Sequence, residues 1–464
     1  MTAQSTAAAP VFQNVMEAIG NTPLVRINHI DTGPCELYLK LENQNPGGSI
    51  KDRIGRSMIE AAEAEGHIKP GDTLIEATAG NTGLGLALVA AQKGYRLIIV
   101  VPDKMAQEKI FHLKALGAQV VLTRSDVGKG HPEYYQDMAE RIAAEEGAFF
   151  VNQFGNAANP LAHETTTGPE ILAQMDGRLD AVVCGVGSAG TITGLSNFFA
   201  KNAPAVEMIL ADPEGSILTN YVETGEISSD VGSWMVEGIG EDFLPPIADF
   251  TRVKKAYTIG DKEAFLTARD VLAREGILAG SSSGTLIAAA LRYCREQTEP
   301  KRVVTFVCDS GNKYLSKMFN DYWMLDQGFL EREPTGDLRD LISRRHTDRA
   351  TVVAAPDHTL LMAYGRMKLY DISQLPVLDD DGKVVGILDE EDILLKVFGD
   401  EAQFKTPVRE AMTSQLEVVS EDSPIGELLP IFHRGHVAIV MSGRQFLGLI
   451  TRMDLLNHLR LRMR

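Results

Sequence analysis

Lys51 lies in the segment Asn45–Arg53, which reads Asn-Pro-Gly-Gly-Ser-Ile-Lys-Asp-Arg and so places two glycines just before a lysine. Glycine lets the backbone approach a ligand closely, and an amine removed from water can form a Schiff base with an aldehyde. Alone, such a lysine is usually a solvated surface residue or a salt-bridge partner. Together with the two glycine-rich turns that follow it in the chain, the segment predicts pyridoxal phosphate chemistry, with Lys51 as both the residue that holds the cofactor and the general base. Because an ordinary lysine has a pKa of about 10.4, burial or nearby positive charge must lower the pKa of Lys51.

A phosphate-binding cup is predicted at Gly185-Val186-Gly187-Ser188-Ala189-Gly190-Thr191. This turn follows a predicted strand, 181–185, and opens a helix, so that backbone N–H groups and the hydroxyls of Ser188 and Thr191 can hold a phosphate. The alternative is a plain turn. A dinucleotide site is disfavoured because the spacing G-x-G-x-x-G is not met.

Two further turns could bind polar groups of a ligand. Thr78-Ala79-Gly80-Asn81-Thr82-Gly83 follows a predicted strand, 73–76, and offers N–H groups and hydroxyls to a substrate carboxylate. Its alternative is an ordinary helix cap by Asn81 or Thr82. The turn Gly280-Ser281-Ser282-Ser283-Gly284-Thr285 also opens a helix, and its hydroxyls could meet a heteroaromatic nitrogen or belong to a plain loop.

The elements that must position these turns alternate along the chain from about Asn14 to about Leu325. Alternating strands and helices predict an α/β domain with a mostly parallel sheet and helices on both faces. Ligands of such sheets bind at the carboxyl ends of the strands. The expected strands are 95–101, 119–123, 181–185, 207–211 and 303–307, and the expected helices are 54–65, 83–93, 107–116 and 133–146.

A change of pattern near Asp326 predicts a domain boundary. Residues 1–325 are expected to form the catalytic domain, 326–345 a charged linker, and 346–464 a pair of small α+β modules. The pair is indicated by two similar passages, 377–392 and 438–454, each of which reads as strand, turn, strand and helix.

Composition limits the partners. The 464 residues carry a formal charge of −18, which disfavours nucleic acid and anionic membrane surfaces. The longest aliphatic run, Leu97–Val101, is too short to cross a bilayer, and the start of the chain lacks the pattern of a signal peptide. Four widely spaced cysteines predict neither a metal site nor disulfides, as in the cytoplasm. Small molecules are the expected partners.

In these pieces, residues 15 to about 325 resemble the fold type II pyridoxal phosphate enzymes of β-replacement, the cystathionine β-synthase and cysteine synthase family, whose fold is like that of tryptophan synthase β. Residues 346–464 resemble a tandem pair of the nucleotide-sensing CBS domains. Both halves in one chain favour the cystathionine β-synthase branch. The resemblance rests on Gly20-Asn21-Thr22-Pro23-Leu24, the Lys51 and Asn81 segments, the phosphate turn and Asn159-Pro160-Leu161-Ala162-His163.

The resemblance implies a role for each site residue. Lys51 would hold the cofactor, Asn81 would bond its phenolic oxygen, and Ser282 would face its pyridine nitrogen. The segment Gly238–Phe243, with Gly240 and Glu241, would lie near the substrate side chain. The phosphate would be wrapped by Gly187, Ser188, Ala189, Gly190 and Thr191, and the substrate carboxylate would be bound by Thr78, Ala79, Gly80, Thr82 and Gln153.

The implied reaction is that of a lyase in transsulfuration, which condenses L-serine or O-acetylserine with L-homocysteine to cystathionine and releases hydrogen sulfide from cysteine as a side activity. A neutral serine at the ring nitrogen favours elimination over transamination. The alternatives are a cysteine synthase that uses sulfide and a nucleotide sensor with a degenerate catalytic body. Self-association, as a dimer or tetramer, is also implied.

Departures from the family pattern lead to two hypotheses. Ala79 replaces a frequent serine, Ala189 a frequent glycine, and Glu241 the tyrosine of animal relatives, while Phe154 likewise lacks a phenol. The substrate preference is therefore expected to move towards O-acetylserine, whose acetate leaves readily; neutral drift is the alternative. Animal relatives also carry a heme-binding extension, for which the segment before the match is too short and has no Cys or His, so no heme is expected.

In the C-terminal module, Thr451 and Asp454 are the expected nucleotide-binding pair, since a carboxylate one turn into a helix can accept ribose hydroxyls. In the first repeat Asp389 stands beside Asp392, and two carboxylates should repel a phosphate. S-adenosylmethionine is the first candidate ligand and an adenine nucleotide the second. The alternative is that the repeats only dimerise.

Overall fold

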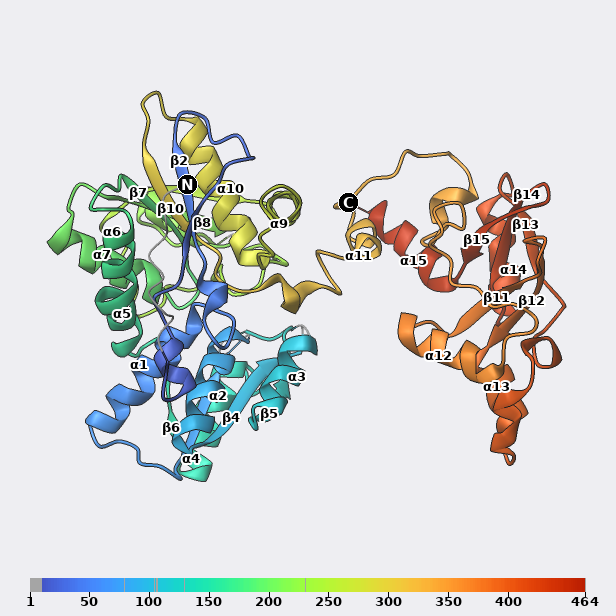
Figure 1. Ribbon diagram of the computed structural model, residues 1–464, viewed down its shortest axis with the longest axis horizontal. Coiled ribbons are helices and arrows are strands. Elements are labelled where there is room, and N and C mark those ends of the chain that lie inside the picture. The colour runs from blue at the N-terminus through green and yellow to red at the C-terminus, as the bar shows by residue number, and fades with distance from the viewer. Residues whose placement is uncertain are drawn as a thin grey trace. The chain divides into compact units, whose positions relative to one another are not determined.

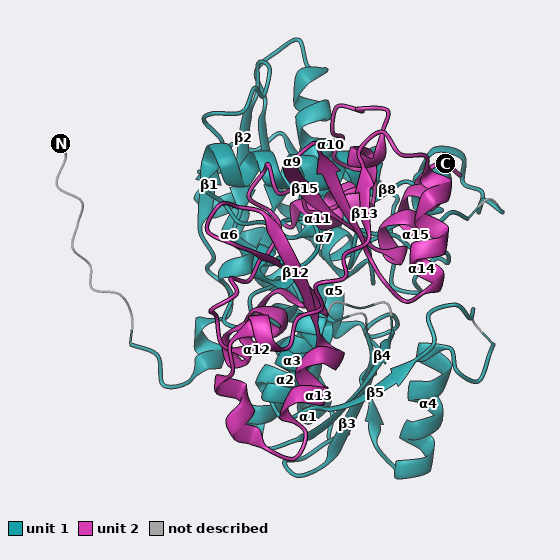
Figure 2. Ribbon diagram, turned by 90° about the vertical axis from the view of Figure 1, so that its right-hand side faces the viewer, with its two compact units in different colours: residues 1–319 teal, residues 320–464 magenta. Residues whose placement is uncertain are grey.

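The computed structural model describes residues 11–463 apart from Ala79, Lys104, Ala106, Lys129 and Asp230. The chain forms two compact units, Met1–Phe319 and Asn320–Arg464 (Figure 2). This division lies slightly before the predicted boundary, because α11 (Asp321–Asp326) groups with the second unit: Asn457 Nδ2 donates to Asp326 Oδ1 at 3.1 Å. The segment expected as a linker also contributes its buried Leu338 and Leu341 to the core of the second unit.

The first unit contains two sheets (Figure 1). One has six strands in the order β1-β2-β10-β7-β8-β9, parallel except for the β1–β2 pair; the other has four parallel strands in the order β5-β4-β3-β6. The strands are β1 (Leu24–Arg26), β2 (Glu36–Lys40), β3 (Thr73–Ala77), β4 (Arg96–Pro102), β5 (Gln119–Thr123), β6 (Phe149–Phe150), β7 (Ala181–Gly185), β8 (Glu207–Pro213), β9 (Val253–Ile259) and β10 (Arg302–Phe306).

Helices flank both sheets, and the prediction of an α/β domain with mostly parallel sheets is confirmed (Figure 1). The predicted strands and helices all occur, with ends that differ by at most a few residues. The helices are α1 (Lys51–Ala64), α2 (Asn81–Lys93), α3 (Gln107–Ala115), α4 (Tyr135–Glu146), α5 (Ala158–Ala162), α6 (Gly168–Gln174), α7 (Gly190–Asn202), α8 (Leu218–Thr224), α9 (Asp261–Glu275) and α10 (Ser281–Arg295).

Two glycines let α1 and α2 pack at backbone distance. A Cβ added at Gly85 would lie 2.5 Å from the carbonyl oxygen of Lys51, and one added at Gly55 would lie 2.6 Å from the carbonyl carbon of Gly85. Since real Cβ contacts are longer, neither position accepts a side chain without moving a helix. The first turns of the two helices, which carry Lys51 and Asn81, are thereby held against each other.

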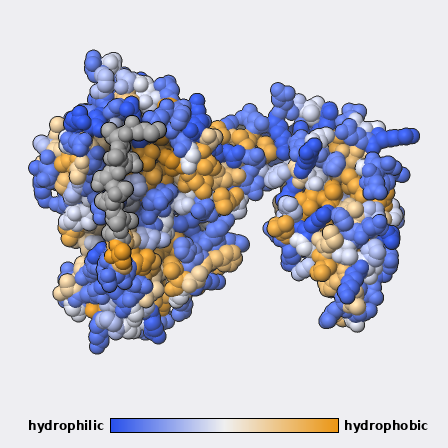
Figure 3. Space-filling view, viewed as in Figure 1, coloured by the Kyte–Doolittle hydropathy of each residue, from blue (hydrophilic) through white to orange (hydrophobic). Residues whose placement is uncertain are grey.

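The second unit holds a two-stranded sheet, β11-β12, and a three-stranded sheet, β13-β14-β15. In the space-filling view, hydrophobic residues show among hydrophilic ones on its surface (Figure 3). Its strands are β11 (Gln374–Leu378), β12 (Val384–Asp389), β13 (Val418–Ser420), β14 (Ala438–Ser442) and β15 (Gln445–Ile450), and its other helices are α12 (Leu360–Tyr370), α13 (Glu390–Val397), α14 (Leu428–His433) and α15 (Arg452–Leu461).

Candidate active site

The predicted turns are brought together by hydrogen bonds between segments that follow strands of the two sheets: Asn81, after β3, donates to Asp309, after β10. The segment of Lys51 follows β2, that of Asn81 follows β3, and Gln153 follows β6. The phosphate turn follows β7. The segment after β10 adds residues that sequence reasoning did not single out, among them Asp309 and Lys313.

Lys51 is the first residue of α1 rather than part of the preceding loop, so that its amine lies at the positive end of a helix dipole. The loop is fixed by backbone bonds to the segment after β10: Ile50 N donates to Cys308 O at 2.8 Å. Burial lowers the pKa of Lys51, and the neighbouring groups of Cys308 and Glu241 only partly oppose this shift. The amine is thus moved towards the neutral form that a nucleophile and base need.

The other two lysines at this site have partners. Lys313 Nζ donates to Asn81 Oδ1 at 2.9 Å, and Lys109 Nζ donates to Glu237 Oε2 at 2.6 Å. Among the residues that the structure describes, Lys51 Nζ has no hydrogen-bond or ion-pair partner. Of the three amines, it is therefore the one available to a carbonyl group.

The turn at the start of α2 joins side chains from distant parts of the sequence. Thr82 Oγ1 donates to Gln153 Oε1 at 2.7 Å, and Asn81 Nδ2 donates to Asp309 Oδ2 at 2.8 Å. Neither side chain caps the helix, whose N-cap is Gly80 at φ +133°. The alternative of an ordinary helix cap is therefore wrong. Thr78 and Gly80 are buried beside this turn, whereas Ala79 lies outside the described residues.

The phosphate turn begins α7 as predicted. Ala189 takes the left-handed φ of +68°, a conformation for which glycine is better suited. The hydroxyls of Ser188 and Thr191 are buried and have partners on α5 and the helical turn after it: Asn159 Nδ2 donates to Ser188 Oγ at 2.9 Å, and Thr191 Oγ1 lies 3.3 Å from His163 Nε2.

The N-cap residues of α1, α2, α7 and α10 make no side-chain capping bond, and each of these helices opens on residues at the candidate site. At α1, Ser49 Oγ accepts from Lys51 N at 3.2 Å. Buried helix starts need partners for their free N–H groups, and an anion satisfies them. A free amine, N–H groups at a helix start and neutral hydroxyls are what pyridoxal phosphate requires, so the residues present fit this cofactor.

Ser282 lies buried in the first turn of α10, near Cys308. Burial raises the pKa of Cys308 to about 12, although a hydrogen bond with the Ser282 side chain opposes the rise. Both groups are therefore neutral at physiological pH. The role predicted for Ser282 at the ring nitrogen stays a prediction.

The segment Gly238–Phe243 lies against the phosphate turn. Gly240 N donates to Val186 O at 2.8 Å, and Glu241 Oε1 lies 3.9 Å from the place that a Cβ at Gly187 would take. The rings of Phe154 and Phe243 are 5.4 Å apart. The structure thus brings the Glu241 carboxylate to the site, together with two phenyl rings that have no hydroxyl.

Glu76 in β3 was not predicted, although a glutamate within a buried strand is a signal that could have found it. It is fully buried, and its Oε2 accepts from Gln153 N at 3.2 Å. Burial raises the pKa of Glu76 to about 8, which the N–H of Gln153 only partly opposes. The carboxyl group is thus protonated in the folded chain at neutral pH and supports the backbone of Gln153.

This pKa predicts a pH effect. Between pH 4.5 and about 8 the unfolded chain releases the proton of Glu76 while the folded chain keeps it, so that rising pH lowers the free energy of unfolding over this window. Glu76→Gln should remove this part, so that the free energy of unfolding of the variant, relative to wild type, rises by about 3.5 kcal/mol from pH 5 to pH 8. Urea unfolding at both pH values measures it, with the exposed Glu145→Gln as control; equal slopes for wild type and Glu76→Gln would contradict the assignment.

In the C-terminal module, Asp454 is already engaged. Thr451 N and Thr451 Oγ1 both donate to Asp454 Oδ2, at 2.7 Å and 2.6 Å, and Ser343 Oγ donates to Asp454 Oδ1. Thr451 and Asp454 form a capping box of α15, and Asp389 and Asp392 form the same box at α13. A ribose would have to exchange with the partners of Asp454.

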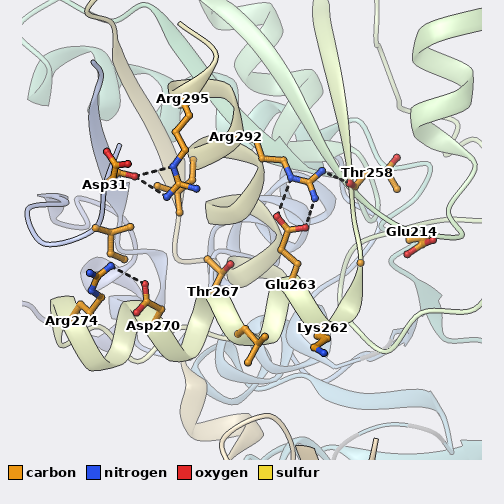
Figure 4. Close-up of a pocket in the computed structure, with 14 residues that line it drawn as sticks. Asp31, Glu214, Thr258, Lys262, Glu263, Thr267, Asp270, Arg274, Arg292 and Arg295 are labelled. Atoms are coloured by element: carbon orange, nitrogen blue, oxygen red, sulfur yellow. Dashed lines mark hydrogen bonds and ion pairs between the residues drawn. The ribbon is translucent and has the colours of Figure 1, made fainter. Parts of the chain in front are cut away.

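A surface groove of about 870 Å³ lies elsewhere in the first unit, beside α9 and α10. None of the predicted site residues lines it, and its arginines are engaged: Arg292 pairs with Glu263, and Arg274 with Asp270 (Figure 4).

Within the described chain, no group of three or more His, Cys, Asp or Glu side chains could hold a metal, and the cysteines are free thiols. Nor does any described helix combine the length and apolar character needed to cross a bilayer.

Comparison with known proteins agrees with this geometry. Residues 15–309 match the family model described as pyridoxal-phosphate dependent enzyme, and residues 339–399 and 408–461 each match the CBS domain. Cystathionine β-synthase of Oryctolagus cuniculus is 38% identical over 468 residues, which cover 96% of this chain and 85% of the relative.

Two solved structures resemble the catalytic part. A hydrogen sulfide-producing enzyme of Fusobacterium nucleatum has a TM-score of 0.62 and 37% identity, covering 66% of this chain and all of its own. The O-acetylserine dependent cystathionine β-synthase of Helicobacter pylori has a TM-score of 0.62 and 35% identity, covering 67% of this chain and 99% of its own.

Proposed function

This chain belongs to the pyridoxal-phosphate dependent enzymes and, among them, to the cystathionine β-synthase family, and on that premise we propose that it condenses L-serine or O-acetylserine with L-homocysteine to cystathionine. Release of hydrogen sulfide from cysteine is proposed as a side activity. The observation that carries the proposal is the amine of Lys51, which lies without a hydrogen-bond partner among the described residues beside helix starts whose N-cap residues make no side-chain capping bond.

When bound, pyridoxal phosphate supplies an electron sink for the bond that breaks at the substrate Cα. Lys51 Nζ takes the α-proton as general base, which its lowered pKa supports. Thr82 and Gln153, already bonded to each other, orient the substrate carboxylate. The N–H groups of Gly187 to Thr191 hold the phosphate, and the Ser282 hydroxyl faces the ring nitrogen without taking on a charge.

Competition between homocysteine and sulfide tests the proposal. The purified holoenzyme is expected to form cystathionine from homocysteine with a kcat/KM well above that for cysteine formation from sulfide. The reverse order would make the chain a cysteine synthase. Protein that binds no cofactor would instead be a sensor with a degenerate catalytic body.

We expect O-acetylserine to be preferred over serine because of Glu241. A carboxylate near the substrate side chain opposes a leaving anion, and hydroxide, the poorer leaving group, suffers more than acetate. Glu241→Tyr removes this charge and adds a phenol that can donate to the leaving oxygen. It should shift the ratio of kcat/KM values towards serine by about tenfold.

Steady-state assays with both substrates measure this ratio, and Glu241→Gln, which removes the charge without adding a phenol, is the matched control. An unchanged ratio in both variants would remove the proposed role of Glu241. A large advantage of serine in the wild type would remove the preference itself.

The C-terminal module is proposed to bind S-adenosylmethionine, or else an adenine nucleotide, through Thr451 and Asp454. Asp454→Ala should weaken the binding of S-adenosylmethionine by about ten- to a hundredfold, since it removes a charged acceptor. Asp392→Ala is the matched control because it breaks the same capping box in the first repeat. Calorimetric titration of both variants decides; equal losses would mean that only helix capping was disturbed.

Three further properties complete the proposal: a cytoplasmic location, no heme, and a dimer or tetramer of identical chains. The free thiols support a reducing compartment. Large apolar side chains are exposed at Leu361 on α12, at Leu395 on α13 and at Phe398 directly after α13, and they support self-association. Light scattering gives the mass in solution, and a heme absorbance band in the purified protein would overturn its expected absence.

A further inference from the structure

The segment Asn159-Pro160-Leu161-Ala162-His163 has no role in the reaction as described, although its two polar side chains are almost completely buried. Asn159 is 1% exposed and His163 0%. Both lie on α5 and the helical turn that continues it, directly behind the phosphate turn. Buried polar side chains are costly unless their hydrogen bonds serve the fold or a ligand, so the partners of these two decide what they do.

Asn159 connects the two anion-binding turns. Its Nδ2 donates to Gln153 O at 2.7 Å and to Ser188 Oγ at 2.9 Å. Gln153 in turn accepts from Thr82 at the start of α2. These hydrogen bonds, joined through the side chain and backbone of Gln153, connect the residues predicted to bind the substrate carboxylate with a hydroxyl predicted to bind the phosphate.

Asn159 occupies space that is available only because residue 190 is a glycine. A Cβ added at Gly190 would overlap Asn159 Oδ1, so the glycine at the start of α7 is required by the asparagine. The same Oδ1 is buried and has no hydrogen-bond partner among the described residues. The two hydrogen bonds that Nδ2 donates are therefore the only side-chain hydrogen bonds of Asn159 to described residues, and they are what its burial serves.

His163 holds the second hydroxyl of the phosphate turn. Its Nε2 lies 3.3 Å from Thr191 Oγ1, and its Nδ1 lies 3.0 Å from Thr167 Oγ1. Burial lowers the pKa of His163 well below its usual value, and the charges of Lys51 and Arg53 add to this shift. The imidazole therefore stays neutral and keeps both hydrogen bonds throughout the physiological range.

We infer that Asn159 and His163 are positioning residues that orient the hydroxyls of Ser188 and Thr191, and that Asn159 couples occupation of the substrate carboxylate turn to the environment of the cofactor phosphate. This inference rests on the proposed function, because it needs a phosphate in the turn that begins α7. Coupling follows because a carboxylate that pulls on Thr82 or Gln153 changes the geometry of the bond that Asn159 gives to Ser188.

Phosphorus-31 NMR of the holoenzyme tests the coupling without turnover. The probe is 3-hydroxypropionate, which has the carboxylate and hydroxyl of serine but no amine with which to displace Lys51. In the wild type, saturation with this probe should shift the resonance of the bound phosphate. In Asn159→Asp, which removes both donated bonds, the shift should disappear, and the Kd for pyridoxal phosphate should rise roughly thirtyfold.

Asn156→Asp is the matched control. Asn156 lies in the loop just before α5, but its Nδ2 donates to Val151 O at 3.0 Å and not to the phosphate turn. This variant should keep the response to the probe. If Asn159→Asp does not fold, Ser188→Ala removes the other end of the same bond and should likewise abolish the response.

The outcomes separate the inference from the proposed function. A response that persists in Asn159→Asp or in Ser188→Ala would overturn the coupling, as would a wild-type resonance that the probe does not move. A wild-type protein that shows no resonance of bound phosphate would overturn the proposed function and the inference with it.

Discussion

Replacing Lys51 with alanine is expected to lower kcat for cystathionine formation by at least about a thousandfold. A positioned general base contributes about a hundred- to ten-thousandfold by itself, and Lys51 is also the amine expected to hold the cofactor. No other lysine at the site can substitute, because Lys109 and Lys313 donate to Glu237 and Asn81. Steady-state kinetics at saturating cofactor measures the loss.

Borohydride reduction followed by peptide mapping provides the control. The label should be found on Lys51 in the wild type and should stay there in Lys313→Gln, whose lysine lies at the same site. A label on Lys313 or Lys109, or a Lys51→Ala variant that keeps more than a tenth of wild-type turnover, would contradict the assignment.

Gly190→Ala is expected to have the second largest effect. The new Cβ would overlap Asn159 Oδ1 in a buried place, so that either the asparagine or the start of α7 must move. Overpacking of this kind costs about 1–3 kcal/mol of folding free energy. Because the displaced groups line the phosphate turn, the Kd for pyridoxal phosphate should also rise by about a hundredfold, as measured by equilibrium dialysis.

Gly365→Ala serves as the comparison. Gly365 lies within α12, and nothing would approach a Cβ there within 4 Å, so that this substitution should stabilise the chain by about 0.5–1 kcal/mol through helix propensity. Thermal unfolding of both variants separates the two effects. Equal cofactor affinity in Gly190→Ala and the wild type would show that the turn tolerates a side chain.

The order of helices and strands could be predicted from the sequence because the pattern of apolar residues differs between helices and strands. Glycines within a few residues also mark Lys51, Ser188 and Ser282 as candidate site residues in the sequence, and their roles stay predictions. The first residue of α1 could not be predicted from the sequence. The glycines before Lys51 indicate a loop there, but α1 begins at Lys51. The preceding residue, Ile50, is fixed by a hydrogen bond to Cys308, which lies far along the chain.

Residues that depend on such distant pairings were missed. Asp309 and Lys313 follow a predicted strand, but nothing near them in the sequence indicates that they contact Asn81. The motif that contains Asn159 could be seen in the sequence, but its hydrogen bonds to Gln153 and Ser188 could not, because these residues come together only in the folded chain. Local pattern thus finds the turns that meet a ligand, and the folded structure finds what holds those turns together.

The contact between Gly55 and Gly85 has a consequence for the choice of substrate. Because α1 and α2 pack at backbone distance, the start of α1 at Lys51 and the start of α2 at Asn81 keep a constant separation. Each substrate amino acid is then expected to place its α-carbon at the same distance from the two helix starts, whatever the length of its side chain. Discrimination among β-substituents is then expected to fall to the segment that carries Glu241, which lies beside the phosphate turn.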